Sequence, residues 1–449
     1  MVPDVEAAML ERLFRLRENE TTVRAELIGG ATTFMTMAYI IVVNPQILSS
    51  SIGAGMDFNA VVAATCIGAA IGTLLMAFLA NYPIALAPGL GLNAYFSFII
   101  CGKMGVPWET ALGIVFLSGI VFTVLTVARV REMVVNAIPA PLKFATAAGI
   151  GLFIAFIGLQ DAGVIVDDPA TYVTLGDLHR PPVLLALFGL IVTSAMMAAR
   201  VRGAIFWGII ITGVGGIVAG LVKFTGVFAL PSLEPTFMKM RPVAALRLEY
   251  LAPIVVLLFF DMFDTVGTLI GVGEQAGFMK DGKLPRVNRA LVSDSIATMA
   301  GAPLGTSNVT SYIESAAGVS AGARTGLANL VTAGLFMVAL FFTPLVQMFG
   351  SGHEIADGVI LHPITAPALI IVGCLMMKCV SRIDWTEYSD AIPAFLTLIV
   401  MPLTFSISHG LAVGFISYPV VKALSGRGRE VHWLVYLLAG LFVLRYIFI

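Results

Sequence analysis

Long apolar stretches separated by short polar turns run along almost the whole chain. A helix of about 20 apolar residues crosses a bilayer, so each stretch of this length predicts a membrane span. The predicted spans are 25–43, 58–80, 84–101, 108–128, 142–160, 182–199, 203–222, 250–272, 289–301, 306–323, 325–349, 364–380, 391–407 and 409–425. The pattern therefore predicts an all-α polytopic membrane protein with about 14 spans.

Composition and charge placement agree with this pattern. The 449 residues are 58% hydrophobic and only 12% charged, whereas a soluble domain is about 25% charged, and the mean hydropathy is +0.96. Nineteen of the 26 Lys and Arg residues fall on one side of the predicted spans and six on the other, with Arg445 left over. This bias predicts that both termini lie near the cytoplasm, in a multi-pass protein of the cell membrane. The sequence leaves open whether Trp433–Ile449, which contains Arg445, also crosses.

Two short stretches are too rich in Gly and Pro for continuous membrane helices: "LAPGLGLNAYFSF" (Leu86–Phe98) and "GAPLGTSNVTSYIESAAGVSAG" (Gly301–Gly322). Irregular backbone at membrane depth is tolerated only where it is buried in protein or lines a cavity. Paired breaks in the two halves of a chain predict a transport site. We therefore expect broken third and tenth spans, with the following residues at corresponding positions: Pro88 with Pro303, and Asn93 with Asn308.

The stretch "FFDMFDTVGTLIG" (Phe259–Gly271) places two carboxylates in the middle of an apolar span. Asp261, Asp264, Thr265 and Thr268 are spaced i, i+3, i+4 and i+7, so they share one face of a helix and are predicted to look into the same space. Each intramembrane carboxylate costs about 2.5–3.5 kcal/mol on insertion scales, which favours a functional site. A buried hydrogen-bond network that ties helices together remains the alternative.

Glu314 and Asn93 add two polar side chains from the broken spans, and these spans carry no Lys or Arg in their interiors. Carboxylates without basic partners suit a cation or a neutral substrate rich in N–H donors. Crowding in a low dielectric favours the protonated form of at least one carboxyl group. The pattern therefore predicts coupling of transport to protons.

Five strings resemble the AzgA-like purine permeases, the adenine/guanine/hypoxanthine branch of the nucleobase–ascorbate transporter (nucleobase:cation symporter) superfamily. They are "TTFMTMAYIIVVNPQIL", "LAPGLGLNAYFSF", "FFDMFDTVGTLIGV", "GTSNVTSYIESAAGVSAGARTG" and "GLAVGFISYPVVKALSGR", and the resemblance runs from about Met9 to Leu424. It implies a uracil-permease-like fold of two inverted seven-span repeats. A cytoplasmic segment 1–24 would precede a core domain (25–128 and 250–349) and a gate domain (129–249 and 350–449), and the core would move against the gate like an elevator.

The resemblance also implies the site residues. These are the side chains of Asn93, Asp261, Asp264 and Glu314 and the backbone beside Ala94 and Ile313. The three carboxylates are the candidates for proton coupling. We expect import of adenine, guanine or hypoxanthine by proton symport in a transporter that is not an enzyme. It would have no cofactor or metal and no nucleic-acid partner, and it would form a homodimer in the lipid bilayer. The preferred purine, and sodium as the alternative coupling ion, stay open.

Two rival functions are also open. The first is an anion (sulfate-like) transporter on the same fold. The second is an intramembrane aspartyl protease, because "PGLGLN" resembles the Gly-Leu-Gly-Asp signature of that class. The second match is poor, since Asn93 stands where the signature needs an acid and the two aspartates lie on one helix.

Overall fold

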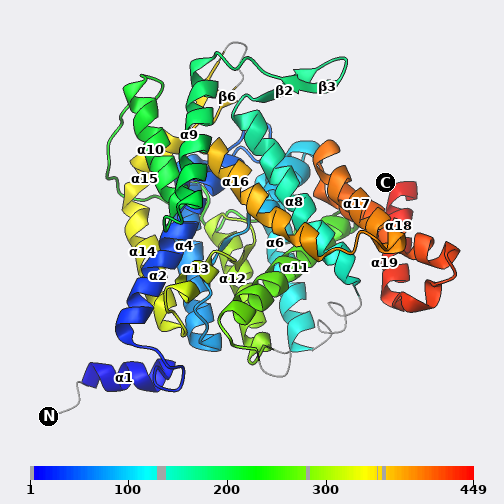
Figure 1. Ribbon diagram of the computed structural model, residues 1–449, viewed down its shortest axis with the longest axis horizontal. Coiled ribbons are helices and arrows are strands. Elements are labelled where there is room, and N and C mark those ends of the chain that lie inside the picture. Colours follow the sequence, from blue (N-terminus) through cyan, green and yellow to red (C-terminus); the bar gives the residue numbers. More distant parts are fainter. Residues whose placement is uncertain (1–4, 129–137, 280–283, 351, 356–359, 449) are drawn as a thin grey trace. The chain divides into compact units, whose positions relative to one another are not determined.

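The computed structural model describes residues 5–128, 138–279, 284–350, 352–355 and 360–448 and is mostly helical (Figure 1). The chain divides into two compact units. The first contains the residues up to Val127 together with His179–Thr365, and the second contains Ala128–Leu178 and Ala366–Ile449. The boundaries predicted for the core and gate domains stay a prediction.

The first unit holds both predicted breaks. Its helices are α1 (Val5–Phe14), α2 (Val23–Met37), α3 (Ile40–Leu48), α4 (Phe58–Leu75) with η1 (Met76–Ala80), α5 (Leu90–Ala94) with η2 (Tyr95–Lys103), α6 (Trp108–Val127), α9 (Pro181–Ala198), α10 (Ala204–Val218), η3 (Leu248–Tyr250), α11 (Leu251–Gln275), α12 (Val287–Leu304), α13 (Ser315–Ser320), α14 (Leu327–Ala339), η4 (Leu340–Phe342) and α15 (Thr343–Gly350). A two-stranded sheet, β5 (His353–Glu354) with β6 (Ile360–Leu361), lies near its end.

The second unit is built from α8 (Ala140–Asp161), the hairpin β2 (Ile165–Asp168) and β3 (Tyr172–Leu175), α16 (Ala366–Met376), η6 (Met377–Arg382), α17 (Tyr388–Leu403), α18 (Ile407–Leu424), η7 (Gly428–Glu430) and α19 (Trp433–Phe448). Small residues let its helices approach closely, as is usual in membranes. A Cβ added to Gly151 of α8 would lie 2.8 Å from the carbonyl oxygen of Gly373 in α16. The nearly buried Lys422 ammonium of α18 binds the carboxylate of Asp390 in α17 at 2.8 Å.

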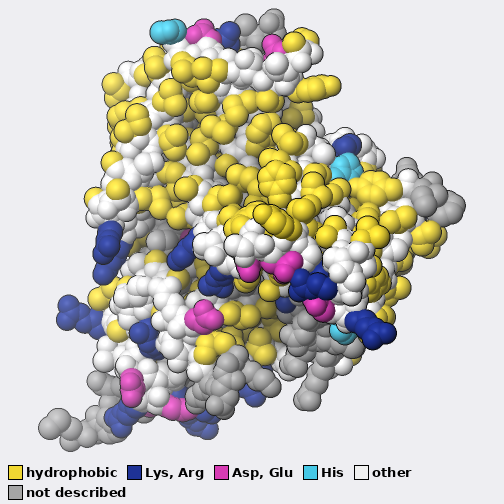
Figure 2. All heavy atoms as spheres, turned by 45° about the vertical axis from the view of Figure 1, so that its right-hand side comes forward, with side chains coloured by type: hydrophobic (Ala, Val, Ile, Leu, Met, Phe, Trp, Pro, Cys, Tyr) yellow, Lys and Arg dark blue, Asp and Glu magenta, His cyan; other side chains and the backbone are white. Residues whose placement is uncertain are grey.

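Each of the predicted membrane spans contains a helix. Among the described residues, eight helices are long and apolar enough to cross a bilayer, so the count of fourteen stays a prediction. Figure 2 shows hydrophobic side chains over much of one face of the molecule. Strongly exposed apolar residues of the chain include Ile191 of α9 and Val218 of α10. So much exposed apolar surface is typical of a protein in contact with lipid.

Both predicted breaks are found, and they meet. Strand β1 (Leu86–Pro88) pairs antiparallel with β4 (Val309–Ser311), with Leu86 opposite Ser311 and Pro88 opposite Val309. Two further backbone bonds extend the pairing: the Gly89 amide donates to the Asn308 carbonyl, and the Tyr312 amide donates to the Ala85 carbonyl, both at 3.0 Å. The strand pair therefore satisfies backbone groups that a broken helix would leave without partners.

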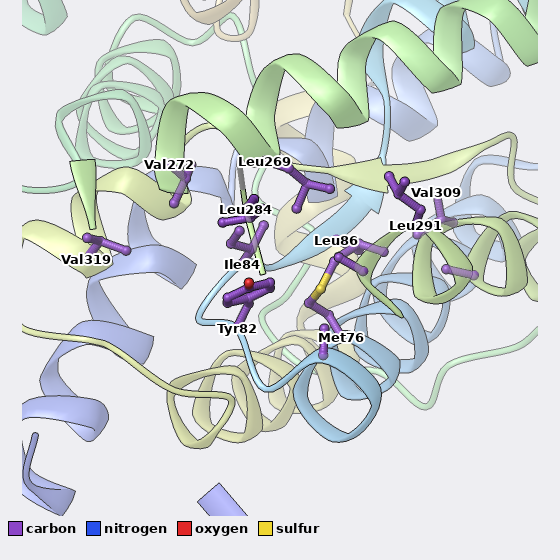
Figure 3. Packing of buried hydrophobic residues seen from close by; sticks show 13 residues of the cluster. Met76, Tyr82, Ile84, Leu86, Leu269, Val272, Leu284, Leu291, Val309 and Val319 are labelled. Carbon is purple, nitrogen blue, oxygen red and sulfur yellow. The ribbon is translucent and has the colours of Figure 1, made fainter. Parts of the chain in front are cut away.

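An apolar cluster packs against one side of this strand pair. Leu86 of β1 and Val309 of β4 point into the same cluster as Met76 and Leu291 (Figure 3). Gly72 of α4 makes the close approach possible, because an added Cβ would lie 3.0 Å from Val309 and 3.1 Å from Leu86. The packing leaves the strands little room to slide.

The correspondence predicted between Pro88 and Pro303 is wrong. Pro88 lies in β1, but Pro303 lies in the last turn of α12, and the second extended piece begins six residues later at Val309. A proline so close to a helix end removes only one hydrogen bond. The helix ends instead at Gly305, whose positive φ of 101° favours glycine.

Candidate functional site

The predicted site residues all lie in the first unit, around the ends of β1 and β4. Strand β1 leads into α5, whose last two residues are Asn93 and Ala94. Strand β4 leads into α13 through a turn that contains Ile313 and Glu314. Helix α11 contacts both α5 and α13 and carries the two aspartates, Asp261 and Asp264.

The Asn93 side chain is fully buried, and only one of its two polar atoms has a hydrogen-bond partner among the described residues. Its Oδ1 accepts a hydrogen bond from the hydroxyl of Ser307, which lies just before β4. Its Nδ2 has no hydrogen-bond partner among the described residues. Because a buried amide without partners is costly, this N–H group is a candidate donor to a ligand. Ala94, the next residue, is also fully buried.

Asp261 is buried in a polar network between α11, α12 and the turn before β4. Its Oδ2 accepts hydrogen bonds from Nδ2 of Asn308 at 2.9 Å and from Oγ1 of Thr298 at 3.1 Å. The Asn308 amide thereby joins the backbone at the start of β4 to α11. These contacts are those of a side chain that holds helices and strand together.

Asp264 lies one turn further along α11, and its side chain is accessible. No hydrogen bond to its side chain is found within the described parts of the chain, and its charge interacts with those of Asp261 and Glu314. Thr265 instead turns inward, toward Asp294 and Thr310 at 2.8 Å each. On this face of α11, Asp261 and Thr265 are thus buried in hydrogen-bond contacts, whereas the Asp264 side chain stays accessible.

Glu314 is half-buried at the turn between β4 and α13. Its Oε1 accepts a hydrogen bond of 2.6 Å from the hydroxyl of Tyr39, which lies between α2 and α3. The Thr36 hydroxyl of α2 also reaches the Glu314 carbonyl oxygen at 3.3 Å. Beside it, the Ile313 side chain is 49% exposed.

The ion pairs among the described residues lie away from these carboxylates, for example at Arg15 with Glu18 and at Lys422 with Asp390. The accessible carboxylates of Asp264 and Glu314 are close enough for their charges to interact, and Glu314 also accepts the hydrogen bond from the Tyr39 hydroxyl. Such a site offers acceptors to N–H groups and one amide donor from Asn93.

Three residues that lie near the site were not predicted from the sequence: Tyr39, Thr298 and Asp294. Asp294 of α12 is fully buried and accepts hydrogen bonds from Thr265 at 2.8 Å and from Ser311 at 3.3 Å. As an acid in the predicted span 289–301 it carries the same signal as Asp261. Tyr39 carries no such signal, because an aromatic side chain in an apolar helix usually belongs to the core.

Residues 24–413 match the permease family Xan_ur_permease. The chain belongs to this family. It is similar over nearly its whole length to curated permeases. The guanine/hypoxanthine permease PbuO of Bacillus subtilis is 46% identical over 440 residues, covering 96% of this chain and 99% of the relative. The adenine permease AdeQ of Escherichia coli is 41% identical over 447 residues, covering 99% and 97%.

The permease also shares its fold with solved transporters. The transmembrane domain of the cyanobacterial bicarbonate transporter BicA matches with a TM-score of 0.62 at 16% identity, covering 87% of this chain and 97% of that one. The anion transporter SLC26A9 of mouse matches with a TM-score of 0.62 at 10% identity, covering 93% and 72%. Membership of the permease family makes the chain a multi-pass membrane transporter.

Proposed function

We propose that this permease imports purine nucleobases, namely adenine, guanine or hypoxanthine. The observation that carries the proposal is the pairing of a donor and an acceptor at the two broken segments. Among the described residues, the Asn93 N–H group has no hydrogen-bond partner, and the hydrogen bond that the Glu314 carboxylate accepts comes from the Tyr39 hydroxyl rather than from a basic side chain. A purine edge presents both ring acceptors and N–H donors, so it can use both. Similarity to guanine/hypoxanthine and adenine permeases supports the same substrate class.

We further propose that transport is coupled to protons, with Asp264 and Glu314 as the first candidates to carry them. Both are accessible carboxylates whose charges interact, which favours binding of a proton by one of them. All proposed site residues lie in one compact unit, so they can travel together in an elevator-like movement of the core domain against the gate domain. No cofactor is needed in this scheme, and the proton is the only coupling ion.

Binding and uptake test the proposal separately. In detergent, hypoxanthine, guanine and adenine should each raise the melting temperature of the purified permease, whereas sulfate and bicarbonate should not. Stabilisation by the anions and not by the purines would replace this proposal with an anion transporter on the same fold.

In proteoliposomes, uptake of labelled hypoxanthine should increase with an inward proton gradient and collapse with a protonophore. Accumulation that persists in fully uncoupled vesicles and follows a sodium gradient would refute proton coupling. The homodimer expected for this fold belongs to the same proposal, and the mass of the purified protein in detergent checks it.

A further inference from the structure

The first span is interrupted where it passes the site. Helix α2 ends at Met37 and α3 begins at Ile40, and the intervening backbone tightens into short-range bonds: the Ile41 amide donates to Ala38 and the Val42 amide to Tyr39, both at 3.1 Å. Pro45 lies further along, inside α3, and cannot donate to the carbonyl of Ile41 one turn before it. The break places Tyr39 at the turn between the two helices.

Tyr39 is almost completely buried, with 2% of its surface exposed. A buried phenol needs a hydrogen-bond partner, and this one donates to Oε1 of Glu314 at 2.6 Å. The neighbouring Tyr312 hydroxyl donates instead to the Pro88 carbonyl. Within the described residues, Tyr39 is thus the side chain that occupies an oxygen of this carboxylate.

A carboxylate with both oxygens open can accept two parallel N–H bonds from one ligand edge, as it does from a guanidinium. The short bond from Tyr39 takes one lone pair of Oε1, so Glu314 keeps one oxygen, Oε2, with both lone pairs for a base. We propose that Tyr39 is a specificity-determining residue, which makes Glu314 read one N–H group of the purine edge rather than two adjacent ones. This inference rests on the proposed function and names the side chain that tunes it.

A comparison of hypoxanthine with guanine distinguishes recognition of one N–H group by Glu314 from recognition of two adjacent N–H groups. The two bases have the same ring, but hypoxanthine offers one N–H at N1, whereas guanine adds the exocyclic amino group at C2 beside it. Loss of the Tyr39 hydroxyl should free Oε1 for that second N–H. The additional hydrogen bond to the charged carboxylate should then raise the affinity for guanine, relative to that for hypoxanthine, about tenfold above the wild-type ratio.

The experiment measures inhibition of labelled adenine uptake by guanine and by hypoxanthine in the wild type, in Tyr39→Phe and in a matched control. Tyr39→Phe removes only the hydroxyl. The control is Tyr82→Phe, which removes a hydroxyl bonded to the Pro285 carbonyl in the same unit. We expect the ratio of the guanine and hypoxanthine inhibition constants to shift about tenfold toward guanine in Tyr39→Phe and to stay unchanged in Tyr82→Phe.

An unchanged ratio in Tyr39→Phe, or an equal loss of affinity for both bases, overturns the inference, because Tyr39 would then only position Glu314. If Tyr39→Phe does not yield folded protein, Tyr39→Met also lacks a donor and is judged by the same ratio. Failure of the proposed function looks different: Glu314→Gln would keep wild-type binding of both bases. An inactive Glu314→Gln together with an unchanged ratio in Tyr39→Phe refutes this inference alone.

Discussion

The two broken segments meet as paired strands, yet they are held in place differently. The first runs from β1 into α5 and η2 and is mostly apolar, with Asn93 and Ser97 as its buried polar side chains. The second runs through β4 into α13, and its polar side chains bond to neighbouring helices. Asn308 bonds to Asp261 and Ser311 bonds to Asp294.

This difference divides the acids near the site into two kinds. Asp261 and Asp294 are fully buried and accept hydrogen bonds from the residues around β4, so they fix the second segment. Asp264 and Glu314 are accessible and are available to a substrate or a proton. An acid inside the membrane is therefore not by itself a transport residue, and its hydrogen bonds decide which kind it is.

The largest effect should come from the accessible acid of the second segment. Glu314→Gln keeps the size of the side chain but replaces one acceptor oxygen with a donor, so it should lower purine affinity by about 10–100-fold. The loss is measured as ligand-induced thermal stabilisation in detergent. Glu274→Gln makes the same change at an exposed position of α11 and should behave like the wild type. Full stabilisation of Glu314→Gln by hypoxanthine would remove Glu314 from the site.

Asp264→Asn should affect transport more than stability. The side chain has no hydrogen bond to lose among the described residues, and removal of a charge relieves about 2.5–3.5 kcal/mol of insertion cost. The variant should melt at or above the temperature of the wild type, while its uptake fails or no longer responds to external pH. A much lower melting temperature with normal pH-dependent uptake would make Asp264 a structural residue.

Asp261→Asn makes the same substitution at the buried aspartate of α11 and so serves as the comparison for Asp264→Asn. It can place an N–H group against the amide of Asn308, so it should lower the free energy of unfolding by about 1–3 kcal/mol. Thermal unfolding of both aspartate variants in the same detergent measures the contrast. If Asp261→Asn is as stable as Asp264→Asn, the division into buried and accessible acids does not hold.

The smallest effect should come from the first segment. Asn93→Ser shortens the donor and keeps a hydroxyl, so it should change the ranking of competing purines by a few fold rather than abolish uptake. Competition of labelled hypoxanthine uptake by adenine and guanine measures the ranking. An unchanged ranking at normal expression would assign Asn93 to packing.

The breaks in the helices and the buried or accessible acids of the membrane spans were predictable because both leave strong signals. Gly and Pro next to polar residues disrupt an apolar pattern, and Asp261, Asp264 and Glu314 are conspicuous in membrane spans. The exact start of the second extended piece was not predictable. A proline such as Pro303 interrupts the apolar sequence pattern in the same way whether it lies in the last turn of a helix or beyond the helix end.

The division between the two aspartates of α11 also lies beyond the sequence. Spacing places them on the same side of the helix, and only the packing of α12 and β4 against α11 decides that Asp261 is covered. The role of Tyr39 depends on a contact between residues 275 positions apart, which no local pattern reports.

The pairing of β1 with β4 also has a consequence for the synthesis of the protein. The Ala85 amide donates to the Ser315 hydroxyl across 230 positions of sequence. The first broken segment therefore lacks this partner until about two-thirds of the chain has been synthesised. During that time the polar backbone of residues 86–88 has no strand partner, and Asp261 enters the bilayer before the Asn308 that binds it. Long-range pairing of this kind forms late and leaves exposed intermediates. A nascent chain halted before residue 309 should therefore be a substrate for membrane quality control even when its preceding apolar helices have inserted.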